Sequence, residues 1–219
     1  MSARKEELKR NLVAVKSKIA EAAANSGREL EEIKLIVVTK TFPLSDVEAL
    51  YELGVRDFGE NRDQEGSAKA PHIPEDATWH FQGQIQSNKL KSISRWADVI
   101  HSLDEIRHAK LIDSISPGKS VLIQISLDGE SENRGGVAPD QLHDFVEELT
   151  SVTKLDLRGF MAVGPLGRAP LSAFSRLREI VKDFPQYRVL SAGMSNDFVE
   201  AISMGATHLR IGSQILGVR

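Results

Sequence analysis

Hydrophobic and polar positions follow two different periods along the 219-residue chain. Residues 3–25 place apolar side chains at helical spacing, with Lys and Glu between them: Leu8, Leu12, Val15 and Ile19. This pattern predicts an amphipathic helix, for which Ser2 is a suitable amino-terminal cap. Residues 33–40 follow as a run of aliphatic and β-branched side chains, which is typical of a strand buried on both faces of a parallel sheet.

Short apolar runs and longer polar or amphipathic segments then alternate to the end of the chain. The predicted strands are 33–40, 55–58, 78–81, 98–101, 121–126, 156–161, 187–191 and 207–211. The predicted helices between them are 45–51, 62–70, 86–94, 104–114, 139–152, 171–184 and 196–204. Alternation of this kind indicates a parallel sheet, and eight units in about 200–250 residues are typical of a closed (β/α)8 barrel.

We therefore expect an α/β fold, a single TIM-barrel domain over residues 1–219 with an extra amino-terminal helix. An open doubly wound sheet is the alternative fold. Its usual Gly-x-Gly-x-x-Gly after the first strand is missing, because Lys40 occupies that position.

Composition narrows the possible environments and partners. A net charge of -3 gives no reason to expect nucleic acid or an anionic membrane as a partner. The chain has no cysteine, which excludes disulfides, thiolate metal sites and cysteine nucleophiles. Its amino terminus has no apolar signal segment, and no apolar run approaches the ~20 residues that span a bilayer. We infer a cytoplasmic protein.

Lys40 closes the first predicted strand, and the chain is organised around that position. Side chains alternate along a strand, so Ile36, Val38 and Lys40 are expected on one side. A plain interpretation is that Lys40 marks where the strand reaches water. The functional interpretation is an amine in a partly dry pocket, where a lowered pKa would allow attack on an aldehyde and formation of a Schiff base.

The last two strands end in segments suited to an anion. Residues 190–197 lead into a helix with Ser195 near its start, and Gly212 and Ser213 follow the eighth strand. In barrels of this type, the loops after strands 7 and 8 form the usual phosphate cradle. Ser195 could also serve only as part of a helix cap.

Four more residues lie at or near strand ends: Asn61, His80, Met161 and Arg210. Arg210 stands in the otherwise apolar segment 207–215, either in a strand-end ion pair or with its guanidinium aimed at a ring nitrogen. Asn61 could cap a helix or bind a ligand, and His80 alone suggests a hydrogen-bonded core histidine. We interpret His101, His108 and His143 as surface or structural residues. No His/Asp/Glu group has metal-ligand spacing in the sequence.

Seven segments in register resemble the YggS/PROSC family of pyridoxal phosphate homeostasis proteins over essentially the whole chain. They begin with Val37–Lys40, Phe58–Asn61 with Gln64-Glu65, and Trp79–Gly83 with Gln86–Lys89. They continue with His101–Asp104, Leu157–Ala162, Leu190–Ser195 and Arg210–Gly217. The turn residue Asn196 and the segments 130–136 and 162–165 depart from the usual family pattern.

The resemblance implies the fold of the alanine racemase amino-terminal domain and pyridoxal phosphate (PLP) held as a Schiff base on Lys40. It implies that Ser195, Gly212 and Ser213 hold the phosphate and that Arg210 faces the pyridine nitrogen. Asn61, His80 and Met161 would line the ring pocket. The family is associated with PLP (vitamin B6) homeostasis without an established catalytic activity. An arginine at the ring nitrogen keeps that nitrogen unprotonated and weakens the electron sink that PLP enzymes use.

Several functions remain open from the sequence. We favour a non-catalytic PLP carrier, whose partners would be PLP and PLP-dependent apoenzymes. A single-domain PLP-dependent racemase or deaminase is the alternative, although neither Tyr51 nor Tyr187 is expected at the site as a second base. An aldolase that captures a sugar phosphate on Lys40 and a pure scaffold are further possibilities. We expect a monomer, because the part that dimerises alanine racemase lies outside this sequence.

Overall fold

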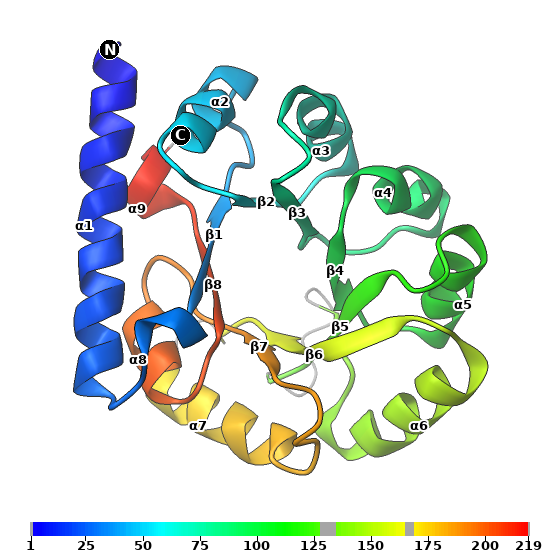
Figure 1. The fold of residues 1–219 in the computed structure, drawn as a ribbon. Helices are drawn as coiled ribbons and strands as arrows, with labels where there is room; N and C mark the ends of the chain where they lie inside the picture. The colour runs from blue at the N-terminus through cyan, green and yellow to red at the C-terminus, as the bar shows by residue number, and fades with distance from the viewer. Residues whose placement is uncertain (1, 128–134, 165–168, 219) are drawn as a thin grey trace.

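The structure is a computed structural model that describes residues 2–127, 135–164 and 169–218. Eight parallel strands form a closed barrel in chain order, with the helices arranged outside it (Figure 1). The barrel closes where β8 pairs with β1, in a register that runs from Lys34 opposite His208 to Val37 opposite Ile211. The predicted α/β barrel with an additional amino-terminal helix is therefore confirmed.

The strands are short, as expected for a barrel of this size. They are β1 Lys34–Val38, β2 Asp57–Glu60, β3 Thr78–Phe81, β4 Val99–Leu103, β5 Ser120–Ile125, β6 Asp156–Ala162, β7 Val189–Ser191 and β8 His208–Ile211. The α-helices are α1 Ala3–Asn25, α2 Leu44–Glu52, α3 Asp63–Lys69, α4 Leu90–Trp96, α5 Ile106–Ile115, α6 Leu142–Val152, α7 Pro170–Val181, α8 Phe198–Ser203 and α9 Ser213–Leu216. Short 3-10 turns precede β1 and β3 and lead into α4 and α6.

Helix α1 lies along the outside of the barrel, beside α8 and α9 (Figure 1). Its predicted apolar stripe is buried, and the side chain of Ser2 accepts a hydrogen bond from the backbone N–H of Lys5. The stripe explains the position of the helix, because amphipathic helices are stabilised mainly by burying one face.

Several predicted strands differ at their ends from those in the structure, and the differences at β1 and β2 bear on the site. Strand β2 begins at Asp57 instead of residue 55, because the N–H of Val55 donates to the carbonyl of Leu50 and completes the end of α2. Strand β1 ends at Val38, so Lys40 lies beyond it. The segment after Ile211 is not an extended apolar strand, since Ser213–Leu216 forms the helical turn α9.

Apolar side chains fill the layer between the barrel and its helices. An aromatic cluster of Phe58, Trp79, Phe81 and Trp96 joins β2 and β3 to α4, with ring centroids 5.3–6.2 Å apart. The inside of the barrel is different, because buried polar side chains from several strands face one another there. No helix in the described parts of the chain is long and apolar enough to cross a membrane.

Candidate functional site

Lys40 stands in a turn immediately after the first strand. Thr39 before it is fully buried, whereas Lys40 itself is exposed. The expected strand alternation therefore does not reach Lys40, and its amine is not in the partly dry pocket that the sequence suggested. The physical reason is the end of β1 at Val38, after which the backbone turns and a period of two no longer applies.

Buried charges hold the residue before Lys40 in place. The Lys69 ammonium donates to the carbonyl oxygen of Thr39 at 2.9 Å and to Glu60 Oε1 at 2.6 Å. The Thr39 hydroxyl donates to the same Glu60 oxygen at 2.7 Å. Burial raises the pKa of Glu60, while the hydrogen bonds from Lys69 and Thr39 oppose that shift. This cluster links the β1 turn to β2 and α3.

The residue after Lys40 is anchored as well. The N–H of Thr41 donates to Glu65 Oε2 at 2.5 Å, and Lys69 lies 3.4 Å from that oxygen. Thr41 has a φ of 67°, in the left-handed region that β-branched residues rarely adopt. Contacts on both sides of Lys40 therefore fix its backbone, while its side chain remains exposed.

The loops after β7 and β8 meet each other near the end of β1. The Gln214 amide donates to the carbonyl oxygen of the buried Ser195, and Ser213 is exposed. A Cβ on Gly212 would lie 2.9 Å from the carbonyl oxygen of Val38, so only glycine permits this approach of the two backbones. The three residues expected to hold a phosphate are thus on two adjoining loops, next to the strand that leads to Lys40.

Arg210 is buried, and its side chain turns toward β6 and β7. Its guanidinium donates to the Ser191 carbonyl at 2.6 Å, to Ser191 Oγ at 2.8 Å and to the Ala162 carbonyl at 2.9 Å. All three acceptors are uncharged. Burial lowers the pKa of Arg210 to about 10, with a smaller opposing effect from Asp197, so the side chain is still cationic at neutral pH.

The remaining three predicted residues, Asn61, Met161 and His80, differ in their surroundings. Asn61 follows β2, and its buried Oδ1 has no hydrogen-bond partner in the described part of the protein. Met161 is buried in β6, opposite Ser191 of β7. His80 is a hydrogen-bonded core histidine, as its sequence position by itself suggests, and its two ring nitrogens contact Asp57 Oδ1 at 3.0 Å and His101 Nε2 at 2.9 Å inside the barrel.

Sequence reasoning missed the buried partners of these residues. Of the two interpretations given for His101, surface or structural, the structure agrees with the second, because His101 is fully buried and its Nδ1 lies 3.0 Å from Ser191 Oγ. Lys69 also escaped notice, although it is buried with Glu60. The alternation Val99, His101, Leu103 was an available signal, since it places His101 on one face of a buried strand.

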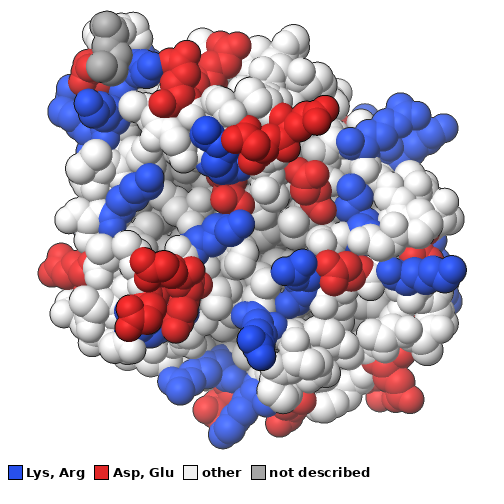
Figure 2. Space-filling view, in the orientation of Figure 1, with Lys and Arg blue, Asp and Glu red and all other residues white. Residues whose placement is uncertain are grey.

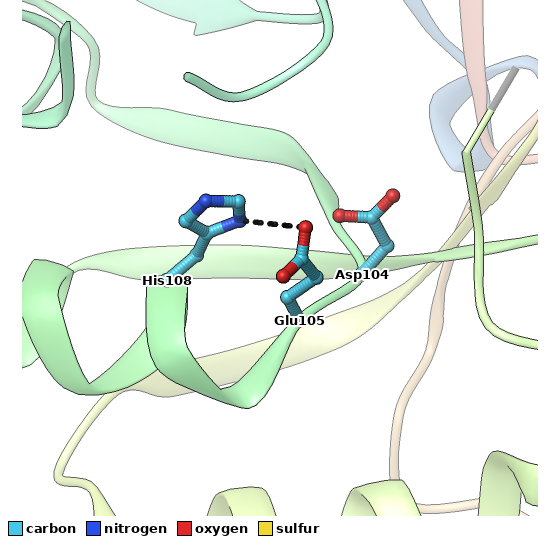
Figure 3. Close-up of side chains that lie close together, drawn as sticks. All are labelled: Asp104, Glu105 and His108. Atoms are coloured by element: carbon cyan, nitrogen blue, oxygen red, sulfur yellow. Dashed lines mark ion pairs between the residues drawn. The ribbon is translucent and has the colours of Figure 1, made fainter. Parts of the chain in front are cut away.

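Three potential metal ligands lie together after β4, which the sequence spacing did not indicate. One ligand atom from each of Asp104, Glu105 and His108 lies within 4.8 Å of the others (Figure 3). The chain's own donors occupy both carboxylates: Asp104 accepts from the Gly136 N–H at 3.0 Å, and Glu105 pairs with Arg107. The cluster therefore requires no ion to explain it.

Charges of both signs are interspersed on the face seen in Figure 2, which looks along the barrel. This surface agrees with the small net charge of the chain. A separate cavity of about 360 Å³ opens beside Asn61, between the turns that follow β2 and β3.

Comparison with known proteins identifies the family of this chain. The family model for the alanine racemase N-terminal domain matches residues 10–219. The pyridoxal phosphate homeostasis protein of Mycobacterium leprae is 37% identical to this chain, covering 98% of this chain and 93% of its own length.

Solved structures of similar fold include a member of this family and an alanine racemase. PipY of Synechococcus elongatus, solved with PLP bound, is 32% identical with a TM-score of 0.78, over 91% of this chain and 100% of PipY. Alanine racemase of Clostridium difficile is 15% identical with a TM-score of 0.73, over 98% of this chain and 57% of the racemase, which is a likeness of fold alone. By these full-length matches, the chain belongs to the family of pyridoxal phosphate homeostasis proteins.

Proposed function

We propose that this protein binds PLP at the carboxyl ends of the barrel strands, holds it on Lys40 and serves in PLP homeostasis. The observation that carries the proposal is the anchored turn of Lys40 beside the adjoining loops of Ser195 and Gly212. The PLP-bound relative PipY and the name of the family support the same ligand.

The residues present fit this cofactor. Gly212 lies against the Val38 carbonyl at a spacing that no Cβ would permit, and backbone N–H groups in a turn of this kind can approach a phosphate. The unpartnered Oδ1 of Asn61 provides a buried polar atom near the same ends of the strands. Arg210 brings a cation that has only uncharged hydrogen-bond partners in the described structure.

Each residue then has a distinct task. Lys40 would provide the primary amine that holds the cofactor through its aldehyde. Ser195, Gly212 and Ser213 bind the phosphate with hydroxyl and backbone N–H groups. Arg210 donates toward the ring nitrogen, and Asn61 and Met161 border the ring. When bound, PLP supplies an electrophilic aldehyde and an electron-withdrawing ring.

Arg210 also affects whether the protein could catalyse a reaction of amino acids. A guanidinium cannot give up its proton to the ring nitrogen at neutral pH, so the ring stays a weak electron sink. We propose that the protein holds and releases PLP as a monomer, with PLP-dependent apoenzymes as recipients, and that it does not racemise amino acids.

Three measurements test the proposal. Purified protein incubated with PLP should turn yellow, and borohydride followed by peptide mass analysis should place the pyridoxyl group on Lys40. A protein that stays colourless and unmodified would contradict PLP binding. Holoprotein should not exchange the α-proton of amino-acid enantiomers in deuterated water, and exchange at enzyme-like turnover would favour the racemase alternative.

A further inference from the structure

Five side chains form a continuous hydrogen-bonded line inside the barrel. The line runs from Arg210 to Ser191, His101, His80 and Asp57, with successive separations of 2.8, 3.0, 2.9 and 3.0 Å. The five residues come from β8, β7, β4, β3 and β2. The middle three are almost completely buried, with exposed fractions of 0–2%. Contacts between five different strands make the line a feature of the closed barrel and not of any local motif.

The two ends fix the direction of every hydrogen bond. Arginine can only donate, and a carboxylate can only accept. Arg210 therefore donates to Ser191 Oγ, which leaves the Ser191 hydroxyl to donate to His101 Nδ1. His101 must then carry its proton on Nε2 and donate to His80 Nδ1. His80 likewise carries its proton on Nε2 and donates to Asp57. Both rings are thereby assigned one tautomer.

The charges agree with this assignment. Burial lowers the pKa of both histidines, and for His101 the neighbouring His80 and Arg210 lower the pKa further, so both rings are neutral at neutral pH. Burial opposes ionisation of Asp57, but its contacts with His80 and Lys34 outweigh that effect and lower its pKa. The acceptor end is a carboxylate, as the direction of the line requires.

The ends of the line lie at different levels of the barrel. Asp57 is the first residue of β2 and forms an ion pair with Lys34, the first residue of β1, at 3.0 Å. A cavity of about 180 Å³ at this amino end is lined by His80, His101 and His208. Arg210 lies near the carboxyl end of β8, where the proposed function places the cofactor ring.

We propose that Ser191, His101 and His80 are positioning residues for Arg210, an inference that rests on the proposed function. Ser191 Oγ accepts a hydrogen bond from one edge of the guanidinium, and it stays an acceptor because its own proton is donated to His101. The line also connects this buried cation to the Asp57 carboxylate through aligned dipoles, and such chains of hydrogen bonds strengthen one another. This support would hold the guanidinium in one orientation at the carboxyl end of β8, where the proposed function puts the ring nitrogen.

The first test needs no cofactor. Nitrogen-15 NMR of the imidazole rings in PLP-free protein should show His80 and His101 as neutral Nε2–H tautomers at pH 7. Variants His80→Gln and His101→Gln assign the signals, since each removes one of them. A proton on Nδ1 of either ring would overturn the inference, whatever the protein does with PLP.

The second test cuts the line in the PLP-bound protein. His101→Leu removes both ring nitrogens, while His101→Gln keeps one acceptor and one donor. We expect His101→Leu to weaken PLP binding about tenfold and to shift the visible absorption of the bound cofactor, because the Ser191 hydroxyl loses its acceptor and no longer keeps a fixed orientation toward Arg210. His101→Gln should restore most of both properties. The exposed His143 provides the control variant His143→Leu, which should change neither.

The outcomes separate this inference from the proposed function. If His101→Leu still gives borohydride-trapped pyridoxyl on Lys40 with unchanged absorption and affinity, the positioning role is wrong. If the wild-type protein fails to bind PLP, the proposed function is wrong, and the tautomers still decide whether the line exists. If His101→Leu does not fold, Ser191→Ala cuts the next link and is judged by the same absorption and affinity.

Discussion

The Lys69 ammonium lies 2.6 Å from Glu60 Oε1, and both side chains are buried directly behind the turn that carries Lys40. A buried ion pair is stable only when each charge keeps its partner, since an unpaired charge in the interior is costly. The pair therefore makes the position of Lys40 depend on α3, an element 23–29 residues further along the chain.

Removing one member of this pair should destabilise the protein. We expect Lys69→Met to lower the free energy of unfolding by about 3–5 kcal/mol, because Glu60 is left buried without its cation. Urea denaturation measures the change. The double variant Lys69→Met/Glu60→Gln should recover much of the loss.

A surface pair provides the matched control. Lys110 and Glu148 lie 3.3 Å apart, and about half of each side chain is exposed. Lys110→Met should cost less than about 1 kcal/mol. Equal losses for Lys69→Met and Lys110→Met would contradict a structural role for the buried pair.

Lys40→Ala should abolish borohydride-trapped pyridoxyl and leave the fold intact. The side chain is exposed, so its removal should change the free energy of unfolding by no more than about 0.5 kcal/mol. Absorption spectra and denaturation curves check the two halves of this prediction. Lys91→Ala, also at an exposed lysine, should retain the visible absorption of bound PLP. Pyridoxyl trapped on another lysine in Lys40→Ala would show that Lys40 is not the specific amine.

Arg210→Glu should alter the visible spectrum of the bound cofactor, because a carboxylic acid beside the ring nitrogen favours its protonation. The same change removes the hydrogen bonds to Ser191 and Ala162, so a loss of stability is expected as well. Arg210→Gln keeps an uncharged donor and separates the two effects. An unchanged spectrum in folded, PLP-bound Arg210→Glu would count against placing Arg210 at the ring.

His208 should make stability depend on pH. Burial lowers the pKa of His208 to about 4 from an ordinary value of 6.5. The unfolded chain therefore binds the proton more readily, and the contribution of neutral His208 to stability is present above pH 6.5 and is lost as pH falls toward 4. The stability lost by pH 4 amounts to at most about 3 kcal/mol.

The measurement compares the pH dependence of the unfolding free energy between wild type and a variant that lacks His208. Unfolding free energies of wild type and His208→Asn at pH 7 to 4.5 should converge or cross as the pH falls, because the variant lacks the titrating group. His143→Asn controls for the loss of an imidazole at an exposed position. Parallel curves for wild type and His208→Asn would refute the assigned pKa.

The barrel could be predicted because it depends on local patterns. Alternating apolar runs and amphipathic segments dictate a parallel sheet whatever the exact ends of its strands, and the carboxyl ends of such strands share one face. The apolar stripe of α1, Lys40 after the first strand and the Gly212-Ser213 turn after the last could all be identified from sequence neighbours.

Tertiary structure alone decided which side chains meet. The exposure of Lys40 depends on where β1 stops, and the displacement of β2 depends on how Val55 completes α2. His80 and His101 are 21 residues apart, and His101 and Ser191 are 90 apart, so their contacts follow from strand register around a closed barrel. A local pattern states which face a residue occupies, but only closure of the barrel brings the faces of distant strands together.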